Sequence, residues 1–216
     1  LYAESITFSP KGTMCTVCYK GEKCSLTVPL VGEFNVYNSL AALGVALSTG
    51  AELKESVNAL SSFSGVAGRL ERVENSAAKN IFVDYAHTED ALKNSLQALK
   101  KIAKGRILCV FGCGGDRDKG KRPLMGSVAE TFCDEVFITS DNPRKERPEV
   151  IIEEILQGIK EKGKVKVEVD RKEAIGEAIA RLKEEDVLLI AGKGHEDYQV
   201  FRDYTIHFDD RIVAKE

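Results

Sequence analysis

The sequence predicts an α/β protein with a mostly parallel sheet, helices on both faces of that sheet, and a smaller unit before it. From Arg69 onward, short apolar runs alternate with segments of helical periodicity, which is the pattern of β-α units in a parallel sheet. Polar or glycine-rich loops follow three of the apolar runs, as expected where parallel strands end at a ligand site. Before Ala67 the order differs, because three strand-like runs precede two helical segments.

The first unit is predicted to hold these three strands and two helices. We expect the strands at 5–9, 14–19 and 24–30, and the helices at Tyr37–Ser48 and about Leu53–Ser61. The second and third strands flank Lys20–Lys23, which predicts a hairpin. The small-residue run Ser62–Gly68 is typical of a domain boundary, so we expect domains at 1–67 and 68–216.

The elements of the second unit follow from its alternation. The expected strands are 70–75, 80–84, 106–111, 135–139, 165–169 and 186–191, and the expected helices are about 89–103, 123–133, 148–162 and 171–183. Leu92, Leu96 and Leu99 recur at helical spacing, which indicates a face that packs in the core. Residues 198–207 predict a hairpin, and a last helix is expected to begin near Asp209.

Composition excludes several classes of protein. The net charge of −3 argues against a nucleic-acid partner, since nucleic-acid binders carry a basic face. No apolar run approaches the roughly 18 residues of a membrane span and no signal peptide is visible, so we expect a cytoplasmic protein without membrane insertion. Cys15, Cys18 and Cys24 lack a fourth ligand at zinc-site spacing, and we expect reduced thiols. Because the chain opens without Met, we expect a fragment of a longer protein.

A glycine-rich loop, Phe111–Arg122, follows one apolar run and precedes a predicted helix. Its glycines permit a sharp turn and the close approach of a ligand. Residues 115–122 depart from a P-loop, because Arg122 stands where that motif needs a Ser or Thr hydroxyl. The loop is either a solvated turn with scattered charges or an anion site, and we favour the anion site because it carries four cations: Arg117, Lys119, Lys121 and Arg122.

Three loops of the second unit are expected at one edge of the sheet, where their side chains can converge. They are the glycine-rich loop, SDNPR at 140–144 and GKGHED at 192–197. Arg pairs with carboxylates in bidentate fashion and Glu196 can take an ammonium, so the loops suit a zwitterion such as an amino acid. Taken alone, SDNPR is equally consistent with a simple turn and GKGHED with a helix start. The converging side chains would be Arg117, Asn142, Arg144, Lys193, His195 and Glu196.

A further cluster lies next to the predicted boundary, in Gly68-Arg69 and in DYAHT at 84–88. Thr88 is a suitable N-cap for the helix that follows. Asp84, at a strand end, could accept ribose hydroxyls as an acidic residue does in dinucleotide sites. His87 belongs either to this site or to the core as a structural residue.

A set of motifs occurs in order between about Val31 and Val213: Gly32-x-Phe34-Asn35-x-x-Asn38, GRLE at 68–71, VDYAHT at 83–88, FGCGGDRDKGKRP at 111–123, DNPR at 141–144 and AGKGHEDYQ at 191–199. In this set the chain resembles the Mur ligase family. The resemblance implies an ATP-dependent ligase of three domains. This chain would hold the end of the central ATP-binding domain and a Rossmann-like C-terminal domain for the incoming amino acid. The P-loop, the UDP-binding region and the Mg²⁺ ligands would lie outside it, so the chain alone is expected to be inactive.

The resemblance also implies roles for individual residues. The ATP-binding positions would be Asn35, Asn38, Arg69, Asp84, His87 and Lys119, and the amino-acid pocket would be Arg117, Asn142, Arg144, Gly192 and Glu196. No catalytic residue and no metal ligand is assigned within the chain. The implied reaction adds meso-diaminopimelate to UDP-MurNAc-L-Ala-D-Glu in peptidoglycan synthesis, through an acyl phosphate made from ATP with Mg²⁺, and a monomer is expected.

The Arg of DNPR is what implies diaminopimelate, since lysine-adding members of the family have a small residue there. Diaminopimelate has a second carboxylate, which Arg144 with Arg117 can bind, while Glu196 receives the distal ammonium. Lysine would leave the Arg fork unpaired, at a cost of about 3 kcal/mol. The alternatives are a lysine-adding or dual-specific ligase, a folylpolyglutamate synthetase-like ligase, against which DNPR and GKGHE count, and a non-enzymatic amino-acid receptor.

Overall fold

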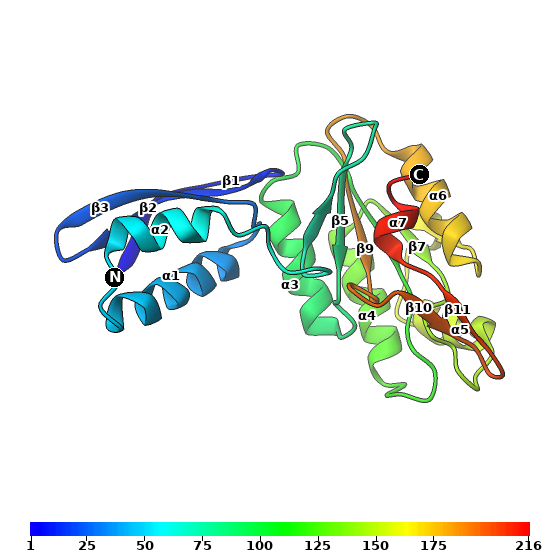
Figure 1. The fold of residues 1–216 in the computed structure, drawn as a ribbon. Coiled ribbons are helices and arrows are strands. Elements are labelled where there is room, and N and C mark those ends of the chain that lie inside the picture. Colours follow the sequence, from blue (N-terminus) through cyan, green and yellow to red (C-terminus); the bar gives the residue numbers. More distant parts are fainter. The chain divides into compact units, whose positions relative to one another are not determined.

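The computed structural model describes all 216 residues and divides the chain into two compact units, Leu1–Val66 and Ala67–Glu216 (Figure 1). No helix in either unit combines the length and the apolar character needed to cross a membrane. All six cysteines are free thiols.

The first unit is a three-stranded antiparallel sheet with two helices. Strands β1 (Tyr2–Ser9), β2 (Gly12–Tyr19) and β3 (Glu22–Val28) pair in that order, and α1 (Glu33–Ser48) and α2 (Leu53–Ser61) follow. The predicted hairpin is confirmed, with Tyr19 opposite Glu22. Helix α1 begins at Glu33 rather than at Tyr37, because Gly32 turns the chain with φ 101° and the acidic Glu33 suits a helix N-terminus.

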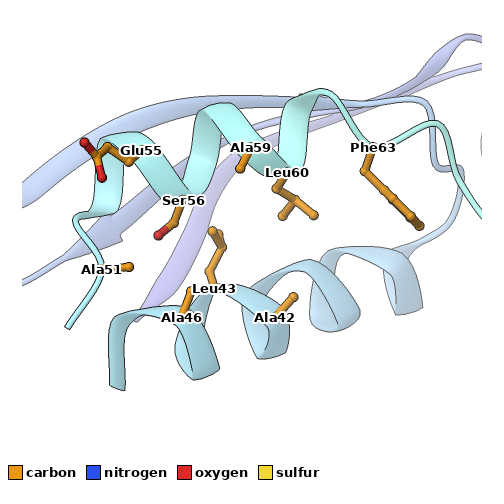
Figure 2. A pocket seen from close by; sticks show the side chains of 9 residues that line it. All are labelled: Ala42, Leu43, Ala46, Ala51, Glu55, Ser56, Ala59, Leu60 and Phe63. Atoms are coloured by element: carbon orange, nitrogen blue, oxygen red, sulfur yellow. The ribbon is translucent and has the colours of Figure 1, made fainter. Parts of the chain in front are cut away.

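Helices α1 and α2 border a hollow of about 510 Å³ (Figure 2). Figure 2 shows Leu43, Leu60 and Phe63 between the two helices. Because Glu55 is the one charged residue of the lining, this hollow lacks the cations that an anionic ligand needs. The full lining is Ala42, Leu43, Ala46, Ala51, Glu55, Ser56, Ala59, Leu60 and Phe63.

The second unit is built on a six-stranded sheet in the order β4-β5-β9-β6-β7-β8. Strand β4 is antiparallel to β5, and every other pair of neighbours is parallel, so the predicted mostly parallel sheet is confirmed. Strand β9 lies between β5 and β6, which sets the loop after β9 beside the loops after those two strands. The strands are β4 (Glu71–Val73), β5 (Asn80–Asp84), β6 (Ile107–Phe111), β7 (Glu135–Ile138), β8 (Val165–Val167) and β9 (Val187–Ala191).

Helices cover both faces of this sheet, as predicted (Figure 1). On one face α3 packs beside α4, which in turn contacts α5, and on the other face Ala174, Ile175 and Ala178 of α6 pack into the core. The helices are α3 (Glu89–Lys100), α4 (Lys121–Phe132), α5 (Pro148–Leu156), α6 (Arg171–Arg181) and α7 (Asp210–Val213). A 3₁₀ turn at Lys162–Lys164 precedes β8. The predicted hairpin near the end of the chain is present as β10 (Tyr198–Val200) and β11 (Thr205–His207).

Helix α5 is shorter than the sequence predicts, ending at Leu156 instead of continuing to 162. The chain then passes so close to α4 that a Cβ on Gly158 would lie 1.8 Å from the carbonyl oxygen of Pro123. Periodicity along one segment cannot reveal such a contact, because it depends on a distant segment.

Candidate functional site

A cleft of about 430 Å³ opens at the carboxyl edge of the parallel strands. All five residues predicted for the amino-acid pocket line it, as does His87, so the structure brings these side chains together. The cleft is lined by Tyr85, His87, Thr88, Gly112, Cys113, Gly114, Arg117, Asp118, Lys121, Asp141, Asn142, Arg144, Gly192, Glu196 and Tyr198.

Several lining residues were not predicted as site residues. Tyr85 and Asp141 stand inside the motifs VDYAHT and DNPR, and their position after strand ends is the signal that could have found them. Tyr198 follows Glu196 by two residues at the start of β10, which carries its ring to the cleft. Lys121 begins α4, and its Nζ donates to the His87 carbonyl oxygen at 2.6 Å.

Buried polar contacts hold the floor of the cleft. Asn142 is buried, and its Nδ2 donates to Glu196 Oε2 at 3.0 Å. Its Oδ1 accepts from Lys193 Nζ at 3.2 Å and from the backbone N–H of Val200 at 3.0 Å. These bonds determine which end of the amide faces Glu196, and they hold the Glu196 carboxylate at the cleft.

Two guanidinium groups share the cleft with this carboxylate. Arg144 has φ 53°, and its Nη1 donates to the carbonyl oxygens of Gly115 at 3.0 Å and of Asn142 at 3.3 Å. The Arg117 side chain makes one long hydrogen bond, at 3.4 Å, to the Asp116 carbonyl oxygen. Most of the donors on both forks therefore stay available to a carboxylate ligand.

Glycine is required at position 192, on the cleft wall. Gly192 has φ +117°, which favours glycine, and a Cβ there would lie 2.6 Å from Asp141 Oδ2. A side chain at this position would push Asp141 away, and Asp141 is the neighbour of Asn142 at the floor of the cleft.

Two of the four cations of the glycine-rich loop, Arg122 and Lys119, pair with protein carboxylates. Arg122 is fully buried and donates to Glu146 at 2.9 and 3.0 Å, to Glu154 at 2.5 Å and to the Gly114 carbonyl oxygen at 3.1 Å. Lys119 Nζ lies 3.1 Å from Glu146 Oε2 and does not line the cleft. The assignment of Lys119 to the nucleotide stays a prediction.

This ion cluster predicts a pH dependence of stability. Hydrogen bonds from Arg122 hold the pKa of Glu146 at about 2, below the ordinary 4.5. A carboxyl group whose pKa is lower in the folded state stabilises the fold above its unfolded pKa and loses that contribution as pH falls through the folded pKa. The free energy of unfolding should therefore fall by about 3 kcal/mol from this group between pH 5.5 and pH 2.

The measurement is urea unfolding of wild type and of Glu146→Gln across that pH range. The wild type should lose more stability than the variant, because the variant has no carboxyl group to protonate at position 146. Parallel losses in the two proteins would show that Glu146 does not carry the effect.

The predicted ATP-binding residues are divided between the two units. Asn35 and Asn38 lie on α1 of the first unit, where Asn38 Nδ2 donates to Asn35 Oδ1 at 3.2 Å. In the second unit, the Arg69 guanidinium lies 4.9 Å over the centre of the Tyr85 ring, and His87 Nδ1 lies 2.8 Å from the Tyr85 carbonyl oxygen. Their contact with a nucleotide stays a prediction.

Asp84 forms hydrogen bonds within the fold. It is buried, and its two oxygens accept hydrogen bonds from Leu70 N at 2.5 Å, Ala86 N at 2.9 Å and Ser95 Oγ at 3.0 Å. Burial raises the pKa of its carboxyl group, against the effect of these donors. Asp84 thus fixes the turn after Gly68 and the first part of α3, and its contact with a ribose stays a prediction.

Comparison with known proteins matches both parts of the chain. Residues 68–194 match the family described as Mur ligase, glutamate ligase domain, and residues 1–46 match the Mur ligase middle domain. The chain therefore belongs to the Mur ligase family. It spans less than half the length of the curated relatives that it matches.

Within the family, two similar relatives carry the name UDP-N-acetylmuramoyl-L-alanyl-D-glutamate--2,6-diaminopimelate ligase. The protein of this name from Prochlorococcus marinus subsp. pastoris is 47% identical over 99% of this chain and 43% of its own length. The one from Gloeobacter violaceus is 48% identical over 100% of this chain and 44% of its own length. A solved structure of such a ligase has a TM-score of 0.76 at 38% identity, covering 99% of this chain and 44% of the solved one.

A more distant solved structure shares the fold alone. Folylpolyglutamate synthase from Thermotoga maritima has a TM-score of 0.69 at 19% identity, over 88% of this chain and 43% of its own. At this identity the likeness concerns the fold and carries no argument about the substrate.

Proposed function

We propose that this chain is part of an ATP-dependent ligase that joins meso-diaminopimelate to UDP-MurNAc-L-Ala-D-Glu in peptidoglycan precursor synthesis. The second unit would receive the amino acid, and the first would be the end of the central ATP-binding domain. The name shared by the relatives supports this substrate pair.

One observation carries the proposal: the cleft sets Arg117 and Arg144 beside Glu196. The two guanidinium forks suit the distal carboxylate of diaminopimelate, and Glu196 suits its distal ammonium. Lysine has the ammonium but not the carboxylate, so it would leave the Arg donors desolvated and unpaired.

The proposed reaction has two steps. The γ-phosphoryl group of ATP passes to the D-glutamate carboxylate, which gives an acyl phosphate and ADP. The amine of diaminopimelate then attacks the acyl carbon, and an amide forms as phosphate leaves. The Ser62–Gly68 run would act as the hinge on which the amino-acid unit closes.

Mg²⁺ is expected with ATP, but this chain offers no cluster of three or more His, Cys, Asp or Glu residues to hold a metal ion. The family resemblance implies that the metal ligands lie outside the chain. We further propose a cytoplasmic location, because the substrates are nucleotide-linked precursors, and we propose that the ligase is a monomer.

The proposal is tested by phosphate release from ATP with the whole ligase and UDP-MurNAc-L-Ala-D-Glu. With meso-diaminopimelate, kcat/KM should exceed that with L-lysine by about 100-fold, which corresponds to the cost of the unpaired Arg fork. Equal use of the two amino acids would contradict the assignment, and turnover that depends on a folate would favour a folylpolyglutamate synthetase-like ligase.

A further inference from the structure

A buried lysine lies beneath the cleft without lining it. Lys193 follows β9, its side chain is fully buried, and it is absent from the cleft surface. Its Nζ is 3.2 Å from Asn142 Oδ1 and 3.6 Å from Glu196 Oε2, and lies 5.6 Å from the centre of the Tyr198 ring. Asn142, Glu196 and Tyr198 all line the cleft.

We propose that Lys193 is a positioning residue, whose ammonium holds the Asn142 amide and the Glu196 carboxylate in the arrangement that receives the distal ammonium of the amino acid. The inference rests on the proposed function, and it adds a residue that acts on the ligand only through its neighbours.

The geometry around Asn142 supports this role. An amide can turn by 180°, and the flipped form would direct Oδ1 toward the Glu196 carboxylate, where two acceptors would repel each other. The Lys193 ammonium can only donate hydrogen bonds, so it is compatible with only one orientation of the Asn142 amide. In that orientation Oδ1 faces Lys193 Nζ and Nδ2 faces Glu196 Oε2. The Val200 N–H also donates to Oδ1 and so favours the same orientation.

The geometry around Glu196 also supports the positioning role of Lys193. The Asn142 amide and the Lys193 ammonium both approach Oε2, which ties down one oxygen of the carboxylate. A carboxylate fixed in this way is preorganised for a cationic ligand and need not be ordered when the ligand binds.

Burying this ammonium is costly, and burial lowers the pKa of Lys193. An apolar side chain of similar length would avoid that cost, and replacing buried ionic groups by apolar ones is often neutral for stability. A role in ligand binding gives this position a reason to carry a charge.

The test uses the whole ligase with Lys193→Met, which keeps an unbranched side chain only one atom shorter and removes its charge. The KM for meso-diaminopimelate should rise at least about tenfold, while the KM for ATP and kcat at saturating diaminopimelate change less than about threefold. Lys193→Gln keeps a donor without the charge and should give an intermediate KM. The matched control is Lys172→Met, an exposed lysine on α6 that is paired with Glu216.

A double-mutant cycle separates positioning from a general structural role. If Lys193 acts through Asn142, adding Lys193→Met to Asn142→Ala should raise the KM by much less than the tenfold expected in the wild-type background. Full additivity, an unchanged KM, or equal effects on ATP and diaminopimelate would each overturn the inference. If the wild-type ligase does not use diaminopimelate, both the proposed function and this inference are wrong. If the wild type uses diaminopimelate and Lys193→Met leaves its KM unchanged, only this inference is wrong.

Discussion

Arg144→Ala in the whole ligase is expected to abolish the effective use of meso-diaminopimelate, with kcat/KM falling about 100- to 1,000-fold. Arg144 lines the cleft, and the carbonyl oxygens of Gly115 and Asn142 hold its guanidinium there through Nη1. Its other nitrogens can therefore form a charge-assisted pair with the distal carboxylate of the ligand. Steady-state kinetics with diaminopimelate as the varied substrate measure the loss.

The matched control is Arg147→Ala, three residues further along the same loop. The Arg147 side chain is 76% exposed and lies 3.5 Å from Glu149, so its removal should leave the kinetics within about twofold of wild type. Unchanged kinetics in Arg144→Ala would remove Arg144 from the proposed site.

The second large effect is expected on stability. Arg122→Ala should lower the free energy of unfolding by about 3–5 kcal/mol, because it leaves Glu146 and Glu154 without their buried partner. It also removes the donor to the Gly114 carbonyl oxygen, so the loop after β6 loses its contact with the start of α4. The midpoint of thermal unfolding of the second unit, followed by circular dichroism, should fall by roughly 10 °C.

Lys119→Ala provides the comparison, since Lys119 pairs with the same Glu146 but its side chain is 59% exposed. An exposed pair of this kind contributes less than about 1 kcal/mol. If Arg122→Ala cost no more than Lys119→Ala, the buried ion pairs of Arg122 with Glu146 and Glu154 would not stabilise the second unit.

The pairing of Lys119 and Arg122 with protein carboxylates could not be predicted from the sequence. Lys119 and Arg122 stand in one short run of cations, and local sequence gives no reason to separate them from Arg117. What separates them is Glu146, which comes from the loop after β7 and reaches this run only in the folded chain. The run of cations alone could not show that Arg122 and Lys119 pair with Glu146, whereas Arg117 lines the cleft.

The alternation of strands and helices, by contrast, was predictable because each segment carries its own periodicity. The loops at 140–144 and 192–197 could be expected at one edge, since all parallel strands of a sheet end on the same side. The insertion of β9 between β5 and β6 was not predictable in this way, because strand order depends on long-range packing. The hydrogen bonds of Asp84 escaped prediction for the same reason, since their donors at Leu70 and Ser95 are distant in sequence.

We propose that the cleft of the second unit recognises both distal groups of diaminopimelate. A crystal structure of the whole ligase with meso-diaminopimelate tests it most directly. We expect the distal carboxylate to lie within hydrogen-bond distance of the Arg144 guanidinium and the distal ammonium within hydrogen-bond distance of the Glu196 carboxylate. A ligand bound elsewhere, or bound in the cleft with its distal carboxylate away from Arg144, would contradict it.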